Sequence, residues 1–234
     1  MFPDYWFTLE AYGLSDRYVQ MIITDTIKTL NMVSLSTFFG TLFGAPIGIY
    51  LATSKKNELL ESPWGNRVVG FIGNFFRSVP FIILAFALMP LTRLLVGSAI
   101  STSAAVVLLT IAAIPFIARL IESAVREVDQ GLVEAARAYG ASPLQIVFKV
   151  LIPEALPGII LAVTLAIVSL IGYSAMVGVV GAGGLGALAL NHGHQLNNVG
   201  LTWTIVIEIV IIVQIVQTIG EWLALRVNKR VRQH

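Results

Sequence analysis

The sequence predicts an all-α protein that crosses a membrane several times, and two observations indicate this. The first is composition: 56% of the 234 residues are hydrophobic and only 12% are charged, whereas a soluble globular domain carries about 25% charged residues. The second is the recurrence of apolar stretches with the roughly 20 residues that a helix needs to cross the hydrocarbon core of a bilayer. We therefore predict one transmembrane domain over residues 1–234, with five helical spans.

The first three spans follow from apolar runs that polar segments separate. Residues 30–52 carry no charge, and residues 70–92 carry only Arg77. Residues 94–118 are again uncharged. Each run is long enough for one helical crossing.

The last two spans share one long uncharged region. Residues 155–207 contain no Asp, Glu, Lys or Arg, and this region is too long for a single crossing. Glycines and histidines interrupt it near residues 181–194. We therefore predict a span at 156–179, a glycine-rich outer connection, and a fifth span at 200–223.

Basic residues follow the first, third and fifth spans. Cytosolic loops of membrane proteins carry an excess of Lys and Arg, so we predict that the N-terminus lies outside and the C-terminus inside. The loop at 129–153 is then cytosolic. Eleven of the 15 basic residues lie on the predicted cytosolic side: Lys55, Lys56, Arg67, Arg119, Arg126, Arg137, Lys149, Arg226, Lys229, Arg230 and Arg232.

Composition also limits the partners and the chemistry. The chain has no cysteine, which excludes disulfides and thiol catalysis, and its net charge of +2 gives no sign of a nucleic-acid partner. Five helices are few to enclose a solute pathway, and no second half of the chain resembles the first. We therefore predict a homodimer with a pore on its two-fold axis.

The cytosolic loop has the signals of two short helices joined by a tight turn. Asp129 can cap a helix that Gly140 ends in a left-handed conformation. Ser142, Pro143 and Gln145 have the spacing of a capping box that starts a second helix. The pattern predicts a rigid elbow, and it leaves open whether the elbow only joins two spans at the membrane surface.

The second helix of the loop is predicted to have an apolar face. Leu144, Val147, Phe148 and Leu151 are spaced at i, i+3, i+4 and i+7, which places their side chains together on an α-helix.

The loop resembles the EAA loop of ATP-binding-cassette importer permeases. Glu134, Ala135, Ala136 and Gly140 match that motif, while Val150 and Ile152 replace its usual Ile and Leu. The resemblance implies that the loop docks on a separate ATPase. The residues expected to couple the two proteins are Glu134, Ala135, Ala136, Gly140, Ser142 and Pro143.

Longer strings are similar to the permeases of methionine importers. They include FRSVPFIILAFALMPLTRLLVG at 76–97 and GYSAMVGVVGAGGLG at 172–186, and the resemblance runs from about Leu30 onward. It implies a multi-pass protein of the bacterial inner membrane, with two permeases on two ATPases and an extracytoplasmic binding protein that delivers D- or L-methionine.

This chain itself is predicted to have no catalytic residue and no cofactor. It lacks the G-x-x-x-x-G-K-[ST] phosphate loop. The resemblance therefore implies that ATP and Mg²⁺ bind to the partner ATPase.

Two sets of glycines have more than one interpretation. Gly181, Gly183 and Gly186 fit G-x-G-x-x-G, but no strand–helix–strand unit surrounds them, so a tight turn or close packing is favoured over dinucleotide binding. Glycines at 40, 44 and 48 form a groove for close helix packing, within the chain in preference to a dimer contact.

Three kinds of polar residue in the apolar regions also allow alternatives. Glu208 lies inside a predicted span and could serve an ion-coupled secondary amino-acid transporter. Arg77 is expected to extend toward the cytosolic surface, with a carboxylate partner as the alternative. His192 and His194 have no further ligands near them in the sequence, so solvated histidines are favoured over a metal site.

The fourth span is the predicted wall of the solute pathway because it continues directly from the elbow. Tyr173, Ser174 and Met176 are the predicted lining, and Met176 is a predicted gate because methionine is flexible and polarisable. Ordinary packing between helices is the alternative for all three.

Overall fold

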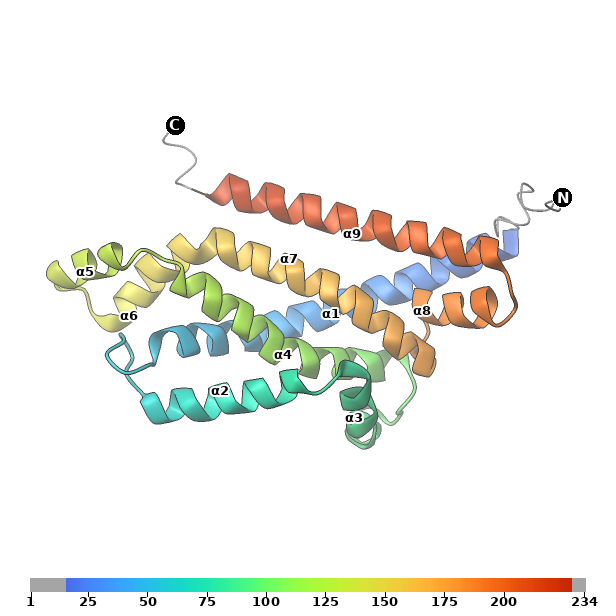
Figure 1. The fold of residues 1–234 in the computed structure, drawn as a ribbon, viewed down its shortest axis with the longest axis horizontal. Helices are drawn as coiled ribbons and strands as arrows, with labels where there is room; N and C mark the ends of the chain where they lie inside the picture. Colours follow the sequence, from blue (N-terminus) through green and yellow to red (C-terminus); the bar gives the residue numbers. More distant parts are fainter. Residues whose placement is uncertain (1–15, 229–234) are drawn as a thin grey trace. The chain divides into compact units, whose positions relative to one another are not determined.

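The computed structural model describes residues 16–228, and these residues form helices joined by short connections (Figure 1). Three short segments are π-helical. The elements are α1 (Asp16–Thr53), α2 (Pro63–Ser78), α3 (Phe81–Val96), α4 (Thr102–Arg126), α5 (Gln130–Ala138), α6 (Pro143–Ile146), η2 (Val147–Leu151), α7 (Ile152–Val177), η3 (Gly178–Ala182), α8 (Leu185–Leu188), η4 (Ala189–His194) and α9 (Val199–Val227).

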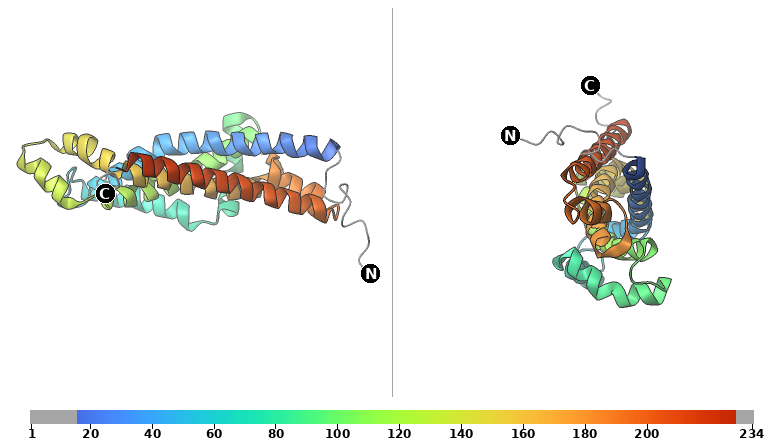
Figure 2. Two further views of the ribbon diagram at one scale, coloured as in Figure 1. Left: turned by 90° about the horizontal axis from the view of Figure 1, so that it is seen from above. Right: turned by 90° about the vertical axis from the view of Figure 1, so that its right-hand side faces the viewer.

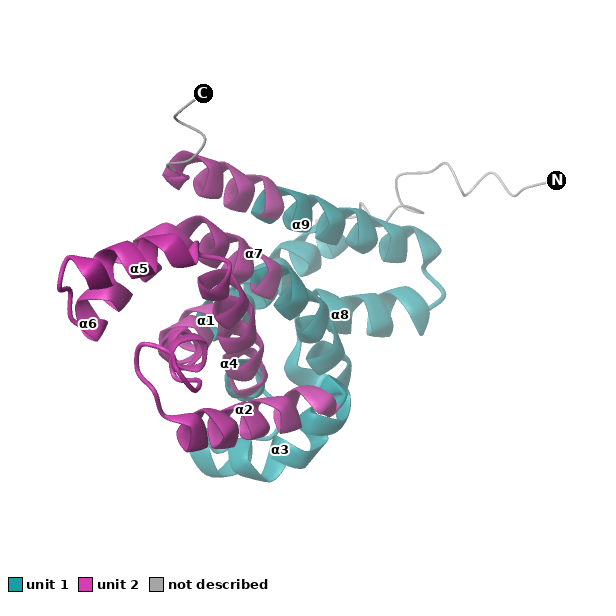
Figure 3. Ribbon diagram, turned by 60° about the vertical axis from the view of Figure 1, so that its left-hand side comes forward, with its two compact units in different colours: residues 1–36, 80–110, 167–216 teal, residues 37–79, 111–166, 217–234 magenta. Residues whose placement is uncertain are grey.

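The described chain divides into two compact units (Figure 3). The first contains residues 16–36, 80–110 and 167–216, and the second contains residues 37–79, 111–166 and 217–228. The helices α1, α4, α7 and α9 contribute residues to both units.

Within the described residues, four helical segments are long and apolar enough to cross a membrane, and the pair α2 and α3 makes a fifth if it counts as one broken span. The second predicted span, 70–92, is therefore not one continuous helix. Val79 is extended, with φ −87° and ψ 127°. Pro80 follows it and supplies no backbone N–H, so the helix stops and a new one begins at Phe81.

Helix α1 begins at Asp16, well before the predicted start of the first span near Leu30. Its polar first half is accommodated by local pairing: Lys28 Nζ lies 2.7 Å from Asp25 Oδ1. The Thr26 hydroxyl oxygen also lies 2.7 Å from the carbonyl oxygen of Ile22. These contacts let charged and polar residues continue a helix that hydropathy alone would end.

The core of the first unit lies beside a segment that we predicted to be an outer connection. Residues 185–194 are helical, as α8 and η4. Leu185 and Leu188 of α8 pack against Leu201 and Ile205 of α9, and all four are at least 98% buried. The contacts of Leu185 and Leu188 thus stabilise a helical conformation in this glycine-rich segment.

In the second unit, the glycines of α1 pack closely against α4. A Cβ added to Gly44 would lie 2.9 Å from the carbonyl oxygen of Ile114. At Gly48 it would lie 2.5 Å from the carbonyl oxygen of Ala118. The predicted packing groove within the chain is therefore confirmed for these positions.

The helices α5 and α6 lie side by side in the second unit and project beyond the adjacent ends of α4 and α7 (Figures 1 and 2). This pair is the elbow that the sequence predicts between 129 and 153. The π-helical segment η2 connects it to α7 without an intervening loop.

We predict that Gly48→Leu destabilises the protein because the new side chain must push α1 away from the backbone of α4. Overpacking of this kind costs about 1–3 kcal/mol. Thermal unfolding of the purified protein in detergent should show a lower midpoint. Gly73→Ala is the matched control because a Cβ at Gly73 meets nothing within 4 Å. Equal midpoints for the two variants would contradict the packing argument.

Candidate functional site

The elbow begins with a capped helix. The side chain of Asp129 accepts a hydrogen bond from the backbone N–H of Gly131 at 2.8 Å, which confirms its predicted capping role. Within α5, Val133 is buried while Glu134 and Ala135 are exposed. Helix α5 therefore packs against the protein through the side that carries Val133 and exposes the side that carries Glu134.

Gly140 forms the turn between the two short helices. Its φ of +78° is in the left-handed region, as predicted, and its N–H donates to the carbonyl of Arg137 at 2.9 Å. Ala141 N–H donates to the carbonyl of Ala136 at 3.1 Å. These two bonds close the end of α5, so the turn has one defined geometry.

The second helix starts with the predicted capping box. The N–H of Ser142 donates to Gln145 Oε1 at 2.9 Å, and Gln145 N–H donates to Ser142 Oγ at 3.4 Å. Pro143 occupies the first turn, where its missing N–H costs nothing. Helix α6 then continues through η2 into α7.

The predicted apolar face of this second helix is divided in the structure. Val147 and Leu151 are buried, but Leu144 and Phe148 are 57% and 65% exposed. The segment therefore carries apolar residues on more than one side. Val147 and Leu151 pack against the rest of the protein, and Leu144 and Phe148 remain exposed.

The elbow therefore presents a surface of polar and apolar side chains. Ala136 is half-buried, and the other residues predicted to couple the two proteins are exposed. We use the name elbow surface for nine of the exposed residues: Leu132, Glu134, Ala135, Tyr139, Gly140, Ser142, Pro143, Leu144 and Phe148.

An ion cluster around a buried carboxylate lies just before the elbow in the sequence, and we did not predict it. Glu122 of α4 is 3% exposed. Its carboxylate accepts from Arg119 Nη1 at 2.5 Å and from Arg126 Nε at 3.0 Å. The spacing Arg-x-x-Glu-x-x-x-Arg is the signal that could have predicted it, because residues three and four apart meet on a helix.

The same cluster ties the ends of α1 and α4 together. Arg126 Nη2 donates to the carbonyl of Leu51 at 2.9 Å. Asn66 Nδ2 donates to the same carbonyl, also at 2.9 Å, and to Ser54 Oγ. A carbonyl at the end of α1 is therefore satisfied by side chains from α4 and α2, and α4 is fixed where the elbow leaves it.

In the first unit, the glycine-rich segment reverses the chain after α7. Gly181, Gly183 and Gly184 all have positive φ, between 80° and 110°. A Cβ on Gly186 would lie 2.4 Å from Ala175 Cα. The segment is both a turn and a close helix contact, which confirms the favoured interpretation of the G-x-G-x-x-G pattern.

The three residues predicted to line the pathway lie in different surroundings. Tyr173 stacks on Phe81, with ring centroids 4.6 Å apart. Ser174 is 2% exposed, and its hydroxyl donates to the carbonyl of Ile171. Met176 is 44% exposed. Tyr173 and Ser174 therefore have contacts within the chain, and Met176 is the one of the three that is exposed.

Glu208 pairs with a residue that we did not predict. The hydroxyl of Thr26 in α1 donates to Glu208 Oε1 at 2.5 Å, while Oε2 is buried without a hydrogen-bond partner. This partner comes from the part of α1 that extends before the predicted first span.

The histidines of η4 lie in different surroundings. Over residues 16–228, the structure has no group of three or more His, Cys, Asp or Glu side chains that could hold a metal ion. His192 is half-buried, with its Nδ1 buried and without a hydrogen-bond partner, and His194 is exposed.

The sequence profile of one family matches most of the chain. This family, the binding-protein-dependent transport system inner membrane component, matches residues 44–233. The chain belongs to this family. It is therefore a multi-pass inner-membrane component of a transport system, and its family is not one of catalytic ATPases.

Two curated relatives and one solved structure extend the similarity beyond the family match. The probable D-methionine transport system permease protein MetI of Vibrio cholerae serotype O1 is 47% identical over 225 residues, which cover 96% of each chain. Its Pasteurella multocida counterpart is 44% identical over 93% of this chain and 100% of that protein. A chain of the inward-facing MetNI methionine ABC transporter has a TM-score of 0.89 and 42% identity, covering 92% of this chain and 99% of its own length.

The similarity begins earlier in the sequence than the motifs indicated. The 225 residues aligned with the Vibrio protein include part of the first 25 residues. We found a resemblance only from about Leu30 because the recognisable motifs lie after that point.

Proposed function

We propose that this chain is the permease of an ATP-driven methionine importer, acting as a homodimer on two ATP-binding-cassette ATPases. An extracytoplasmic binding protein delivers the methionine, and ATP with Mg²⁺ binds to the ATPases. The N-terminus lies outside and the C-terminus inside, with five spans if α2 and α3 cross as one broken element.

One observation carries the substrate: the 47% identity to a probable D-methionine permease over 96% of both chains. The similarity to the membrane chain of the MetNI methionine ABC transporter supports the same assignment and the presence of an ATPase partner.

The elbow surface supports the coupling role. Tyr139 is 92% exposed. Tyrosine is enriched at protein interfaces because it combines an apolar ring with a polar hydroxyl. Together with Leu144 and Phe148, it gives a docking ATPase an apolar centre with a polar rim.

The connection from the elbow to α7 supports the transmission of movement. The capping box at Ser142 fixes the start of the second helix, and η2 continues into α7 without a loop. A push on the elbow by an ATPase would therefore reach the start of α7 directly. Met176, at the exposed side of α7, is the residue that we propose to line the pathway and to gate it.

The alternative of an ion-coupled carrier has less support. It depended on Glu208, and the Thr26 hydroxyl gives this carboxyl group a partner within the chain. The similarity to methionine ABC permeases favours the ATP-driven importer.

We predict that vesicles containing this chain, its ATPase and its binding protein accumulate labelled methionine only when ATP is supplied on the side of the membrane where the ATPase is bound. The chain alone should not accumulate methionine, because it has no phosphate loop to use ATP. The measurement is uptake of labelled methionine into proteoliposomes.

Glu208→Gln is the control that separates the two functions. It keeps the size of the side chain and a group that can accept from Thr26, so ATP-dependent uptake should persist. Uptake by the chain alone under a proton or sodium gradient, lost in Glu208→Gln, would favour the ion-coupled carrier.

We predict that Gly140→Val abolishes coupled uptake and leaves the protein inserted in the membrane. The left-handed backbone costs a residue with a Cβ about 1–2 kcal/mol, and a β-branched side chain makes it worse. The turn should therefore change its geometry. Methionine uptake and the amount of complex with the ATPase are the two measurements.

The matched control at this position is Gly140→Asn. Asparagine adopts left-handed conformations readily, and a Cβ at Gly140 meets nothing within 4 Å. Uptake should be retained in this variant. Normal uptake in Gly140→Val would show that the geometry of the turn does not matter for coupling.

For the pathway, we predict that the accessibility of a cysteine at Met176 to thiol reagents changes with the nucleotide state of the ATPase. The chain has no native cysteine, so Met176→Cys carries a unique label. Ser174→Cys, at a buried position two residues away, should stay unreactive in every state. Reactivity at Met176→Cys that never varies would contradict the proposed gate.

A further inference from the structure

The second unit contains a cavity of about 400 Å³ that the proposed function does not use. It lies between α1, α2 and α4, and its volume is within the roughly 300–1,000 Å³ of typical small-molecule sites. Eleven of the 14 residues around it are apolar side chains or glycines. A ligand that fills it must therefore be largely hydrocarbon.

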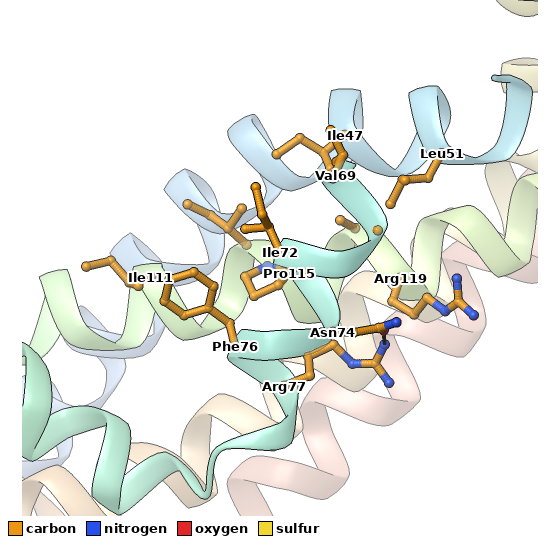
Figure 4. Close-up of a pocket in the computed structure, with 14 residues that line it drawn as sticks. Ile47, Leu51, Val69, Ile72, Asn74, Phe76, Arg77, Ile111, Pro115 and Arg119 are labelled. Carbon is orange, nitrogen blue, oxygen red and sulfur yellow. Dashed lines mark hydrogen bonds between the residues drawn. The ribbon is translucent and has the colours of Figure 1, made fainter. Parts of the chain in front are cut away.

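The three polar side chains of the cavity gather along one side (Figure 4). They are Asn74 and Arg77 of α2 and Arg119 of α4. Ile111 and Phe76 lie toward the other side of the cavity. The site thus combines an apolar chamber with a cationic margin.

The margin has unbalanced positive charge. Arg77 Nη1 donates to Asn74 Oδ1 at 3.5 Å, and no carboxylate among residues 16–228 lies within ion-pair distance of Arg77. Arg119 is paired with Glu122, but Glu122 is shared with Arg126. Three arginines and one glutamate leave a formal charge of +2 near the cavity. The carboxylate partner that the sequence allowed as an alternative for Arg77 is therefore not found among residues 16–228.

This charge pattern does not fit the transported amino acid. A methionine zwitterion would bring its ammonium group into a site whose ionic groups are cations. The single nearby carboxylate, Glu122, is already held by two arginines and is 3% exposed. An anion with an apolar tail satisfies both the chamber and its margin.

We propose that this cavity binds an anionic phospholipid from the leaflet on the side of the 129–153 loop. The headgroup phosphate accepts hydrogen bonds from Arg77 and Arg119, and part of an acyl chain fills the space beside Ile47 and Ile111. The bilayer supplies this ligand continuously to a protein of the inner membrane. Arginine suits the phosphate because its planar group donates in pairs.

The glycines of α2 give a way to fill the cavity without disturbing its walls. Gly73 lines the cavity, and a Cβ added there meets nothing within 4 Å. Gly73→Leu therefore places a branched apolar side chain into the chamber without a backbone clash. Arg77→Gln removes the unpaired charge while keeping a hydrogen-bonding group. Arg119 is left unchanged because its loss would leave the buried Glu122 with Arg126 as its one ion-pair partner.

Arg67→Gln is the matched charge control. Arg67 is on the same helix as Arg77 and is exposed, and it does not line the cavity. The variant removes the same charge from α2 and leaves the site intact.

The experiment measures lipid retention by the full-length protein in the complex with which it is purified. Delipidated samples are titrated with dioleoylphosphatidylglycerol or with dioleoylphosphatidylcholine, and bound lipid is counted by native mass spectrometry. We expect the native chain and Arg67→Gln to retain phosphatidylglycerol over phosphatidylcholine. Arg77→Gln should weaken the binding of phosphatidylglycerol about tenfold, which corresponds to the loss of one charge-assisted hydrogen bond. Gly73→Leu should weaken the binding of both lipids.

Several outcomes would overturn the proposal. They are equal retention of phosphatidylglycerol by all variants, equal retention of the two lipids by the native chain, and displacement of bound lipid by L-methionine. Displacement of bound lipid by inorganic phosphate at low concentration would also contradict the proposal, because it would show that the acyl chain adds nothing to the affinity. If Gly73→Leu shifts the oligomeric state and leaves lipid retention unchanged, the cavity is an interface with a second copy of the chain.

Discussion

Hydrocarbon offers no partner to a backbone N–H or C=O, and this constraint limits where the membrane-spanning helices can break. A chain in a bilayer must satisfy its backbone within itself, so it remains helical wherever it can. Breaks are confined to residues that tolerate them. Pro80 follows the extended Val79 between α2 and α3, and Gly181, Gly183 and Gly184 reverse the chain after α7 with positive φ. Elsewhere, the side chains of Arg126 and Asn66 satisfy a carbonyl at the end of α1.

The same constraint explains why polar side chains in this protein occur in groups. Glu122 is almost fully buried and is held by two arginines, because an ionised carboxylate removed from water is costly without compensating charge. Glu208 receives the hydroxyl of Thr26. Each group also joins two helices or two turns, so polar residues that cost free energy to bury give the apolar helices defined positions relative to their neighbours within a unit.

Local signals in the sequence predicted the elbow well. Asp129, Gly140 and Ser142 act through bonds to residues two to three positions away, so their spacing contains the whole geometry. The glycine spacing of α1 was equally informative, because close packing needs small residues at regular intervals.

Other features depend on contacts between distant residues, which spacing does not reveal. The helical form of 185–194 requires the leucines of α8 to meet Leu201 and Ile205. Helix α1 includes an ion pair between Asp25 and Lys28, which hydropathy counts as two charges. Tyr173 and Ser174 were predicted from their place on the expected wall, and spacing did not reveal that Tyr173 stacks on Phe81 or that the Ser174 hydroxyl donates to the carbonyl of Ile171.

The π-helical segment η2 determines the rotational phase between the elbow and α7. A π turn contains one residue more than an α turn, and one residue corresponds to about 100° of rotation and 1.5 Å of rise along an α-helix. The five residues Val147–Leu151 thus set the direction in which Phe148 and the preceding helix point around the α7 axis. Homologous chains that lost one residue here would keep both helices intact and present a different side of the elbow to whatever docks there.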